Sequence, residues 1–296
     1  MKKQIRMVLG FILLAATIAV FAWYMHAHPE ILRQLKQVKS ITLVVLLGLY
    51  AVFFAALVAI LQVSVRMYQK NISIKENFLL SAYSSLINFF GPGQSGPGLR
   101  AIYLKRRHNL GIKQYIFATL LYYACYAVIS ACMMFIGSRS WWQTTLFVLA
   151  VGGGSALILG WYARKSKLHE RSAIMRFGGW MFLATLGQLL AQVAIYFVEI
   201  HAITSHVSFG QIVTYTGAAN FALFAALTPG AIGIREAFLV FTHNLHHISN
   251  NVIVTANVID RAAYLVFLGL LFVVVLSLHA GKKFKLRQMA AEEAQK

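Results

Sequence analysis

Long runs of apolar residues, separated by short polar segments, make up most of this 296-residue chain. About 20 apolar residues are enough for a helix to cross the hydrocarbon core of a bilayer. Runs that meet this requirement occupy residues 7–25, 41–65, 115–137, 141–162, 178–200 and 252–279. The first is longer than the hydrophobic region of a signal peptide, so we interpret it as an uncleaved helix. The pattern predicts an all-α integral membrane protein with six transmembrane helices.

Two further apolar runs are interrupted by proline and glycine where a spanning helix would continue. Residues 78–90 lead into GPGQSGPG at 91–98, and residues 211–228 lead into PGAIG at 229–233. Backbone groups freed at such a break are tolerated at membrane depth only when they are buried in protein or face water. We therefore expect two re-entrant helical hairpins. Their turns would be formed by Pro92, Gly93, Gly96, Pro229, Gly230 and Gly233.

The charge of the chain supports this topology. There are 27 Lys and Arg residues against 8 Asp and Glu, which gives a formal net charge of +19. With six spans, two re-entrant hairpins and both termini in the cytoplasm, most of the basic residues fall in cytoplasmic segments, as the positive-inside rule requires. The exceptions include the basic residues of the 26–40 segment and Arg139. A soluble basic module that could bind nucleic acid is not expected.

The same topology divides the chain into inverted halves, about 1–137 and 138–281. Each half consists of two spans, a hairpin and a third span. The two breaks share the pattern P-G-x-x-G and contain two of the four prolines. Inverted repeats with paired interrupted segments are typical of transporters that bind substrate near the bilayer midplane. We expect a single polytopic domain over 1–281, followed by a basic cytoplasmic tail at 282–296.

Four ionisable residues lie within otherwise apolar sequence in the second half: Arg235, Glu236, Asp260 and Arg261. A charge at the bilayer centre costs about 2.5–3.5 kcal/mol on insertion scales, so these side chains should face one another or a cavity. Adjacent residues point about 100° apart on a helix. Arg235 would therefore pair with Asp260, or Glu236 with Arg261. The four either form structural ion pairs or line a polar cavity in which an arginine meets lipid phosphate, and the two interpretations are compatible.

The first break could also bind an anion. Successive backbone N–H groups of its glycine-rich segment could form an anion-binding nest, and Arg100 follows directly. The alternative is a tight turn that needs glycine for positive φ. The lysine of a phosphate-binding Walker loop is missing, so nucleotide hydrolysis is not expected.

Other reactive side chains predict no catalytic, cofactor or metal site. No G-x-S-x-G elbow occurs. His243, His246 and His247 have a spacing that could bring them to one helical face, but no nearby cysteine or carboxylate completes a metal site. Glu199, at the end of the fifth run, is expected to be interfacial. The two cysteines, Cys125 and Cys132, lie within one predicted helix and are expected to be unpaired packing residues.

With these motifs in view, the chain resembles the lysylphosphatidylglycerol synthase transmembrane region family, the flippase-like domain found in the multiple peptide resistance factor. The resemblance rests on GPGQSGPGLRAIYLKRR at 91–107 and LTPGAIGIREAF at 227–238. The family's second motif is matched by Pro229, Gly230, Gly233 and Glu236, and its first by Pro92, Gly96 and Arg100.

The resemblance implies a stand-alone flippase-like protein of a bacterial inner membrane. It would bind or translocate a phospholipid or lipid-linked substrate, and anionic or phosphate-bearing lipids would be its partners. We expect the headgroup to meet Arg100, Arg235, Glu236, Asp260 and Arg261. One alternative is a scaffold for an enzyme of lipid or glycolipid synthesis. A membrane-embedded lipid transferase is less well supported, because the carboxylate cluster that would bind its metal is missing. We therefore expect no enzymatic activity.

Overall fold

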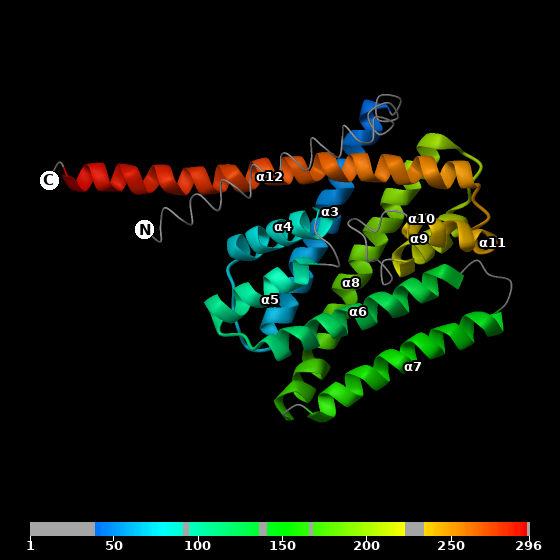
Figure 1. The fold of residues 1–296 in the computed structure, drawn as a ribbon, viewed down its shortest axis with the longest axis horizontal. Helices are drawn as coiled ribbons and strands as arrows, with labels where there is room; N and C mark the ends of the chain where they lie inside the picture. Colours follow the sequence, from blue (N-terminus) through cyan, green and yellow to red (C-terminus); the bar gives the residue numbers. More distant parts are fainter. Residues whose placement is uncertain (1–38, 91–94, 136–140, 166–167, 223–233, 295–296) are drawn as a thin grey trace.

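The computed structural model describes residues 39–90, 95–135, 141–165, 168–222 and 234–294. All regular structure in these ranges is helical (Figure 1). The predicted first span at 7–25 lies outside the described residues. So do five of the six predicted turn residues, namely Pro92, Gly93, Pro229, Gly230 and Gly233.

Four helices in the described residues are long and apolar enough to cross a membrane. They are α3 (Ser40–Arg66), α6 (Ile112–Phe135), the Arg176–Ile203 part of α8 (Leu168–Ile203) and the Asn250–Leu278 part of α12 (Asn250–Ala294). Each coincides with a span predicted from the sequence. The chain is therefore a multi-pass membrane protein with an all-helical architecture in its described part.

The remaining helices are shorter or less continuously apolar. The predicted span at 141–162 forms α7 (Trp141–Lys165), whose described apolar portion is Thr145–Leu157. On either side of the first break lie α4 (Ile74–Phe90) and α5 (Ser95–His108). On either side of the second lie α9 (Phe209–Ala222) and α10 (Ile234–Phe241), followed by the single turn α11 (His243–His246).

Helices α3 and α8 form the centre of the fold and make the largest interhelix contact. Figure 1 shows α4 and α5 on one side of this pair and α9, α10 and α11 on the other, with α12 crossing above and α6 and α7 below. Helix α12 is 45 residues long, or about 67 Å at 1.5 Å per residue. The segment expected to be a basic tail thus continues the last helix as far as Ala294.

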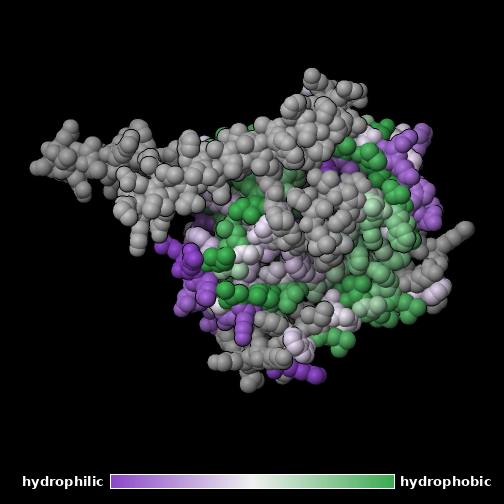
Figure 2. All heavy atoms as spheres, in the orientation of Figure 1, coloured by the Kyte–Doolittle hydropathy of each residue, from purple (hydrophilic) through white to green (hydrophobic). Residues whose placement is uncertain are grey.

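Large apolar side chains cover much of the outer surface. Leu157, Leu149 and Trp180 are each more than 60% exposed, although water would strongly disfavour such a surface. Figure 2 shows hydrophilic residues gathered at opposite ends of the visible face, around α4 and α5 and around α11, with hydrophobic residues between them. This arrangement suits a protein whose middle is surrounded by lipid.

Two glycines allow helices of the interrupted segments to pack closely. A Cβ on Gly217 of α9 would collide with the backbone N of Met134 and lie 2.6 Å from the carbonyl oxygen of Ser130, both on α6. A Cβ on Gly96 would lie 2.7 Å from the carbonyl oxygen of Ser84 on α4. Gly96, predicted as a turn residue, thus lies in the first turn of α5. It is needed there because the α4 and α5 backbones approach each other so closely.

Candidate functional site

A buried ion pair joins α10 to α12. Arg235 Nη1 lies 2.7 Å from Asp260 Oδ2, and both side chains are 9% exposed. A carboxylate and a guanidinium at this distance form a charge-assisted hydrogen bond, which partly offsets the large cost of burying the charges. The pair between Arg235 and Asp260 that the sequence predicted is confirmed.

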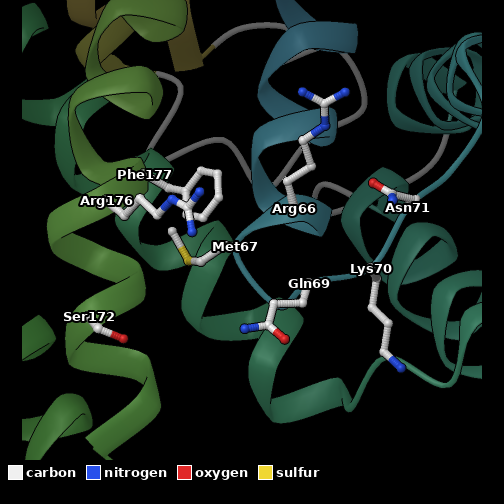
Figure 3. A pocket seen from close by; sticks show the side chains of 8 residues that line it. All are labelled: Arg66, Met67, Gln69, Lys70, Asn71, Ser172, Arg176 and Phe177. Carbon is white, nitrogen blue, oxygen red and sulfur yellow. The ribbon is translucent and has the colours of Figure 1, made fainter.

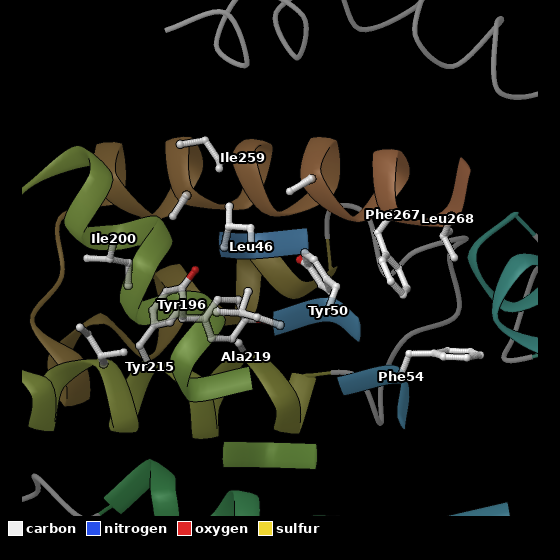
Figure 4. Close-up of a cluster of buried hydrophobic side chains, with 14 of the residues drawn as sticks. Leu46, Tyr50, Phe54, Tyr196, Ile200, Tyr215, Ala219, Ile259, Phe267 and Leu268 are labelled. Atoms are coloured by element: carbon white, nitrogen blue, oxygen red, sulfur yellow. The ribbon is translucent and has the colours of Figure 1, made fainter. Parts of the chain in front are cut away.

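Aromatic side chains enclose this pair. The Tyr50 hydroxyl on α3 donates to Asp260 Oδ1 and lies 3.2 Å from the Asp260 carbonyl oxygen. The Arg235 guanidinium carbon lies 5.2 Å from the ring centre of Tyr196 on α8, a cation–π distance. Tyr215 on α9 packs edge-on against Tyr196, with 5.2 Å between ring centres. Figure 4 shows Tyr50 and Tyr196 within this buried layer, beneath α12.

One edge of the Arg235 guanidinium makes no hydrogen bond of regular geometry to the described residues, although the Tyr215 side chain on α9 also interacts with Arg235. Nη1 binds Asp260, whereas Nε and Nη2 are buried without a hydrogen bond. A buried donor left unsatisfied costs about 1–3 kcal/mol. Nε and Nη2 form the planar edge that binds two oxygens of a phosphate or carboxylate at once. Arg235 is therefore equipped to accept an anion while it keeps Asp260.

A second carboxyl group, Glu199 on α8, lies close to the pair. Its side chain is fully buried, interacts with the side chain of Asp260 and lies within electrostatic range of Arg235, although its two oxygens make no hydrogen bond of regular geometry to the described residues. Glu199 was expected at the membrane interface; its depth in the membrane stays a prediction, but its side chain is enclosed by protein, as is that of the neighbouring Ile200. One carboxyl group thus pairs with the Arg235 guanidinium, and a second lies within electrostatic range of it.

Arg100, expected at the headgroup site, lies on α5 rather than beside Arg235. It is partly buried, and its Nε has no hydrogen-bond partner among the described residues. It lies within electrostatic range of Tyr122 and Tyr123 on α6 and of Tyr264 on α12. Tyr264 is also within electrostatic range of Asp260. The two arginines therefore approach the same tyrosine-rich interior from different hairpins.

The other two expected site residues contribute less to this picture. Arg261 is partly buried on α12, one residue beyond Asp260. The side chain of Glu236 lies outside the described part, so its pairing with Arg261 stays a prediction. Of the expected headgroup residues, the structure thus brings together Arg235 and Asp260, and it adds Glu199, Tyr50 and Tyr196.

Further polar contacts cross the interior between helices. The Tyr126 hydroxyl on α6 donates to Asn220 Oδ1 on α9 at 2.9 Å, and Tyr122 donates to Gln188 Oε1 on α8 at 3.1 Å. Asn220 Nδ2 and Thr214 Oγ1 are buried without a partner among the described residues. Unsatisfied polar atoms are rare in native interiors and call for a ligand, water or another functional reason.

The ends of α4 and α5 opposite their break are held together by a carboxylate. Glu76 Oε1 accepts from the Tyr103 hydroxyl at 2.6 Å and lies 2.8 Å from His108 Nε2. Partial burial alone would raise the pKa of Glu76, but these two hydrogen bonds and the nearby positive charges lower it. At the break, the Gly96 N–H donates to Asn88 Oδ1 at 3.4 Å, so Asn88 helps to start α5.

Among the histidines near α11, His246 is held by hydrogen bonds to the backbone. His246 is fully buried, and its Nδ1 accepts the Ile248 N–H at 3.1 Å, so Nε2 carries the proton that it donates to the Leu239 carbonyl at 3.0 Å. Burial lowers the pKa of His246 to about 4. Both ring nitrogens are occupied, which leaves none for a metal. No group of three His, Cys, Asp or Glu residues gathers in the described ranges.

Comparison with known proteins agrees with this architecture. Residues 7–271 match the family described as the lysylphosphatidylglycerol synthase TM region. No curated protein and no solved structure was found to match the chain. The family match extends from the first predicted span into α12 and includes both interrupted segments. The chain therefore belongs to the lysylphosphatidylglycerol synthase TM region family.

Proposed function

We propose that this protein binds a phosphate-bearing lipid through Arg235 and translocates it across a bacterial inner membrane, with both termini in the cytoplasm. The observation that carries the proposal is the buried Nε and Nη2 edge of Arg235, which makes no hydrogen bond of regular geometry to the described residues. Membership of a lipid-related membrane family is consistent with a lipid substrate.

The chemistry of the interior favours a lipid phosphate over a neutral headgroup. An arginine edge bonds two phosphate oxygens in a plane, and both bonds are strengthened by a surrounding of low dielectric constant. The Tyr196 ring and the Asp260 carboxylate hold the guanidinium in place. The headgroup would therefore meet a donor pair that is already oriented. Part of the cost of desolvating the phosphate would be offset by satisfying these two donors.

Proximity of a second arginine suggests a path rather than a single binding point. Arg100 lies within electrostatic range of Tyr122, Tyr123 and Tyr264, and Tyr264 in turn lies within electrostatic range of Asp260. A headgroup that left Arg235 could be received by Arg100 on the other hairpin. Glu236, Asp260 and Arg261 complete the set of charges proposed to contact the substrate.

The proposed mechanism requires two related halves, and the order of the helices supports this. Pro92 and Pro229 lie 137 residues apart. Displacement by this distance places α3 over Arg176–Ile203 and α6 over the start of α12. It also places α4 over α9 and α5 over α10, within a few residues.

The contacts between helices show the same correspondence between the two halves. Helix α6 packs against α9, as α12 packs against α4, and α5 packs against α6, as α10 packs against α12. Helices α3 and α8 correspond to each other and pack together at the centre. Figure 1 shows α3 and α8 running in opposite directions, and likewise α6 and α12, as inverted halves require. We propose that α4–α5 and α9–α10 are re-entrant hairpins that enter from opposite sides.

The test is a dye-quench flipping assay in proteoliposomes, with fluorescent phospholipids that differ in headgroup. Arg235→Lys keeps the charge that Asp260 needs but removes the planar edge, so it should fold and lose roughly tenfold or more of the flipping rate, the value of about one charge-assisted hydrogen bond. Glu236→Gln tests the neighbouring carboxyl. Arg106→Gln is the matched control, since Arg106 is an exposed cation on α5.

Each outcome separates the proposals. Flipping by the wild type and by Arg106→Gln, but not by folded Arg235→Lys, would support lipid transport through this interior. Equal rates for all three proteins would exclude Arg235 as the headgroup ligand. If the folded wild type moved none of the lipids, passive flipping would be rejected. Transport driven by an ion gradient through Glu236 or Asp260, or a scaffold role beside a lipid-synthesis enzyme, would then be examined.

A further inference from the structure

A pocket of about 430 Å³ lies where the end of α3 meets the start of the spanning part of α8, away from Arg235. Arg66 lines it from the last turn of α3 and Met67 from directly after that helix, and Arg176 and Phe177 line it from α8. The turn after α3 contributes Gln69, Lys70 and Asn71, and α8 adds Ser172. Figure 3 shows these side chains around the junction, with Arg176 and Phe177 directed toward Met67.

Among the described side chains, the lining carries three positive charges and no acidic residue. Arg66, Lys70 and Arg176 are the charged members, and the amides of Gln69 and Asn71 supply further hydrogen-bond donors. Met67 is buried and Phe177 partly buried, so the pocket has an apolar base. Like charges gathered around a cavity repel one another unless an anion lies between them. This composition selects an anion with several acceptor oxygens.

The turn after α3 forms one side of this pocket. Helix α3 ends at Arg66, and in the turn that follows Gln69 is in the left-handed region at φ 56, while the Lys70 N–H donates to the Val65 carbonyl at 3.3 Å. This is the usual way in which a helix ends in a left-handed residue, but glycine is preferred at that position. Here a glutamine occupies it, and the turn carries Lys70 and Asn71 around the cavity next to Arg66.

The pocket is lined by the ends of two membrane-spanning segments. Arg66 is the last residue of one membrane-spanning segment and Arg176 the first of another. Trp180, one helical turn from Arg176 on the same face of α8, is 63% exposed. Exposed tryptophans at the ends of spanning helices mark the interface between hydrocarbon and headgroups. Basic pockets between helices at this depth are suited to phosphate-bearing headgroups.

We propose that this pocket binds the phosphate of an anionic phospholipid from the leaflet that borders it, separately from the interior site at Arg235. The guanidinium of Arg176 would bind phosphate oxygens from α8, while Arg66 and Lys70 neutralise the charge from α3. The lipid would thereby hold the two central helices together at this end. The inference rests on the pocket alone and does not require that anything be transported.

The experiment is native mass spectrometry of the full chain in detergent, titrated with phosphatidylglycerol, phosphatidylcholine or inorganic phosphate. Arg176→Gln and Lys70→Gln should each weaken one phosphatidylglycerol site roughly tenfold. Lys105→Gln, an exposed cation on α5 outside the pocket, is the matched control and should leave binding unchanged. Arg235→Lys should also leave this site intact, which separates it from the interior site.

The competing ligands decide the source of the phosphate. Tight binding of phosphatidylglycerol with weak binding of inorganic phosphate supports the lipid proposal. Equal affinity for inorganic phosphate and phosphatidylglycerol, both lost in Arg176→Gln, would overturn a lipid ligand in favour of a soluble phosphate. Equal binding of phosphatidylcholine, or no effect of the two pocket variants, would overturn the site. Thermal melting of each variant without lipid shows whether it has folded.

Discussion

At the scale of single residues, Arg235 Nη1 donates a hydrogen bond to Asp260, whereas its Nε and Nη2 make no hydrogen bond of regular geometry to the described residues. Asp260 accepts a hydrogen bond from Tyr50 and forms the ion pair with Arg235, whereas Glu199 is buried beside them and interacts with Asp260 without a cation of its own. The two carboxyl groups should therefore differ greatly in their contribution to stability. A buried ion pair that loses one partner leaves an uncompensated charge, which typically costs 3–5 kcal/mol.

Asp260→Asn should destabilise the protein by about 3 kcal/mol, because Arg235 would lose its counter-charge. Glu199→Gln should leave stability nearly unchanged, since the amide keeps the size of the side chain and can still donate a hydrogen bond to Asp260. Thermal unfolding of the detergent-purified protein measures both effects. The double variant Arg235→Gln, Asp260→Asn should be less destabilised than Asp260→Asn alone, and strictly additive losses would contradict the coupling.

His246 should make stability depend on pH. Its pKa falls to about 4 in the folded protein because of burial, against about 6.5 in an unfolded chain. The unfolded state therefore binds more protons between these values, and stability that is fully present above pH 6.5 is lost as the pH falls toward 4. The shift corresponds to an upper limit of about 3 kcal/mol.

His246→Gln is the matched control for this effect, because an amide can accept from Ile248 and donate to Leu239 without titrating. The melting temperature of the wild type should fall more steeply between pH 6.5 and pH 4.5 than that of His246→Gln. Parallel curves for the two proteins would show that His246 does not titrate in this range.

At the scale of helices, close backbone contact is the main requirement of the interrupted segments. The hydrophobic effect does not drive helix association within lipid. Close van der Waals packing at small residues stabilises the association instead. Gly217 allows α9 to approach α6, and Gly96 allows α5 to approach α4. The sequence showed both glycines, but nothing in it distinguished Gly217, which must be small, from Gly210 in the same helix.

Gly217→Ala should destabilise the protein by about 1–3 kcal/mol, since the added methyl group would meet the α6 backbone at Ser130 and Met134. Gly210→Ala, with no atom within 4 Å of the added group, should be neutral or slightly stabilising, because alanine favours the helix. Melting temperatures of the two variants provide the comparison. Equal effects would show that α9 and α6 are not in close contact.

At the scale of the whole molecule, the proposed inverted repeat fixes which loops share a side of the membrane. If α4–α5 is a re-entrant hairpin, Ile74 and Lys105 face the same side. If α9–α10 is one, His206 and Ser249 both face the other side. A full crossing by either hairpin would separate the members of its pair.

Single cysteines at these four positions, in a protein whose Cys125 and Cys132 are replaced by alanine, should show the arrangement. A membrane-impermeant thiol reagent applied to intact cells should label His206→Cys and Ser249→Cys. It should label Ile74→Cys and Lys105→Cys only after permeabilisation. Opposite labelling within one pair would reject a re-entrant hairpin at that position.

The sequence by itself determined the membrane class and four helices long and apolar enough to span the membrane, and it offered the pair between Arg235 and Asp260 as one of two pairings. These follow from local physics, because apolar length defines a span and a charge within it demands a partner. The sequence could not place Glu199, which stands near the end of an apolar run and looks interfacial until α8 is packed against its neighbours.

Only the tertiary structure decided which side chains share the interior. Tyr50 and Tyr196 come from helices about 150 residues apart, and tyrosine within an apolar helix carries no sequence signal of its partner. The free edge of Arg235 depends on the direction from which Asp260 approaches it. The basic pocket depends on the ends of α3 and α8 meeting. Contacts between distant segments are set by packing geometry, whereas periodicity and composition describe only each helix in turn.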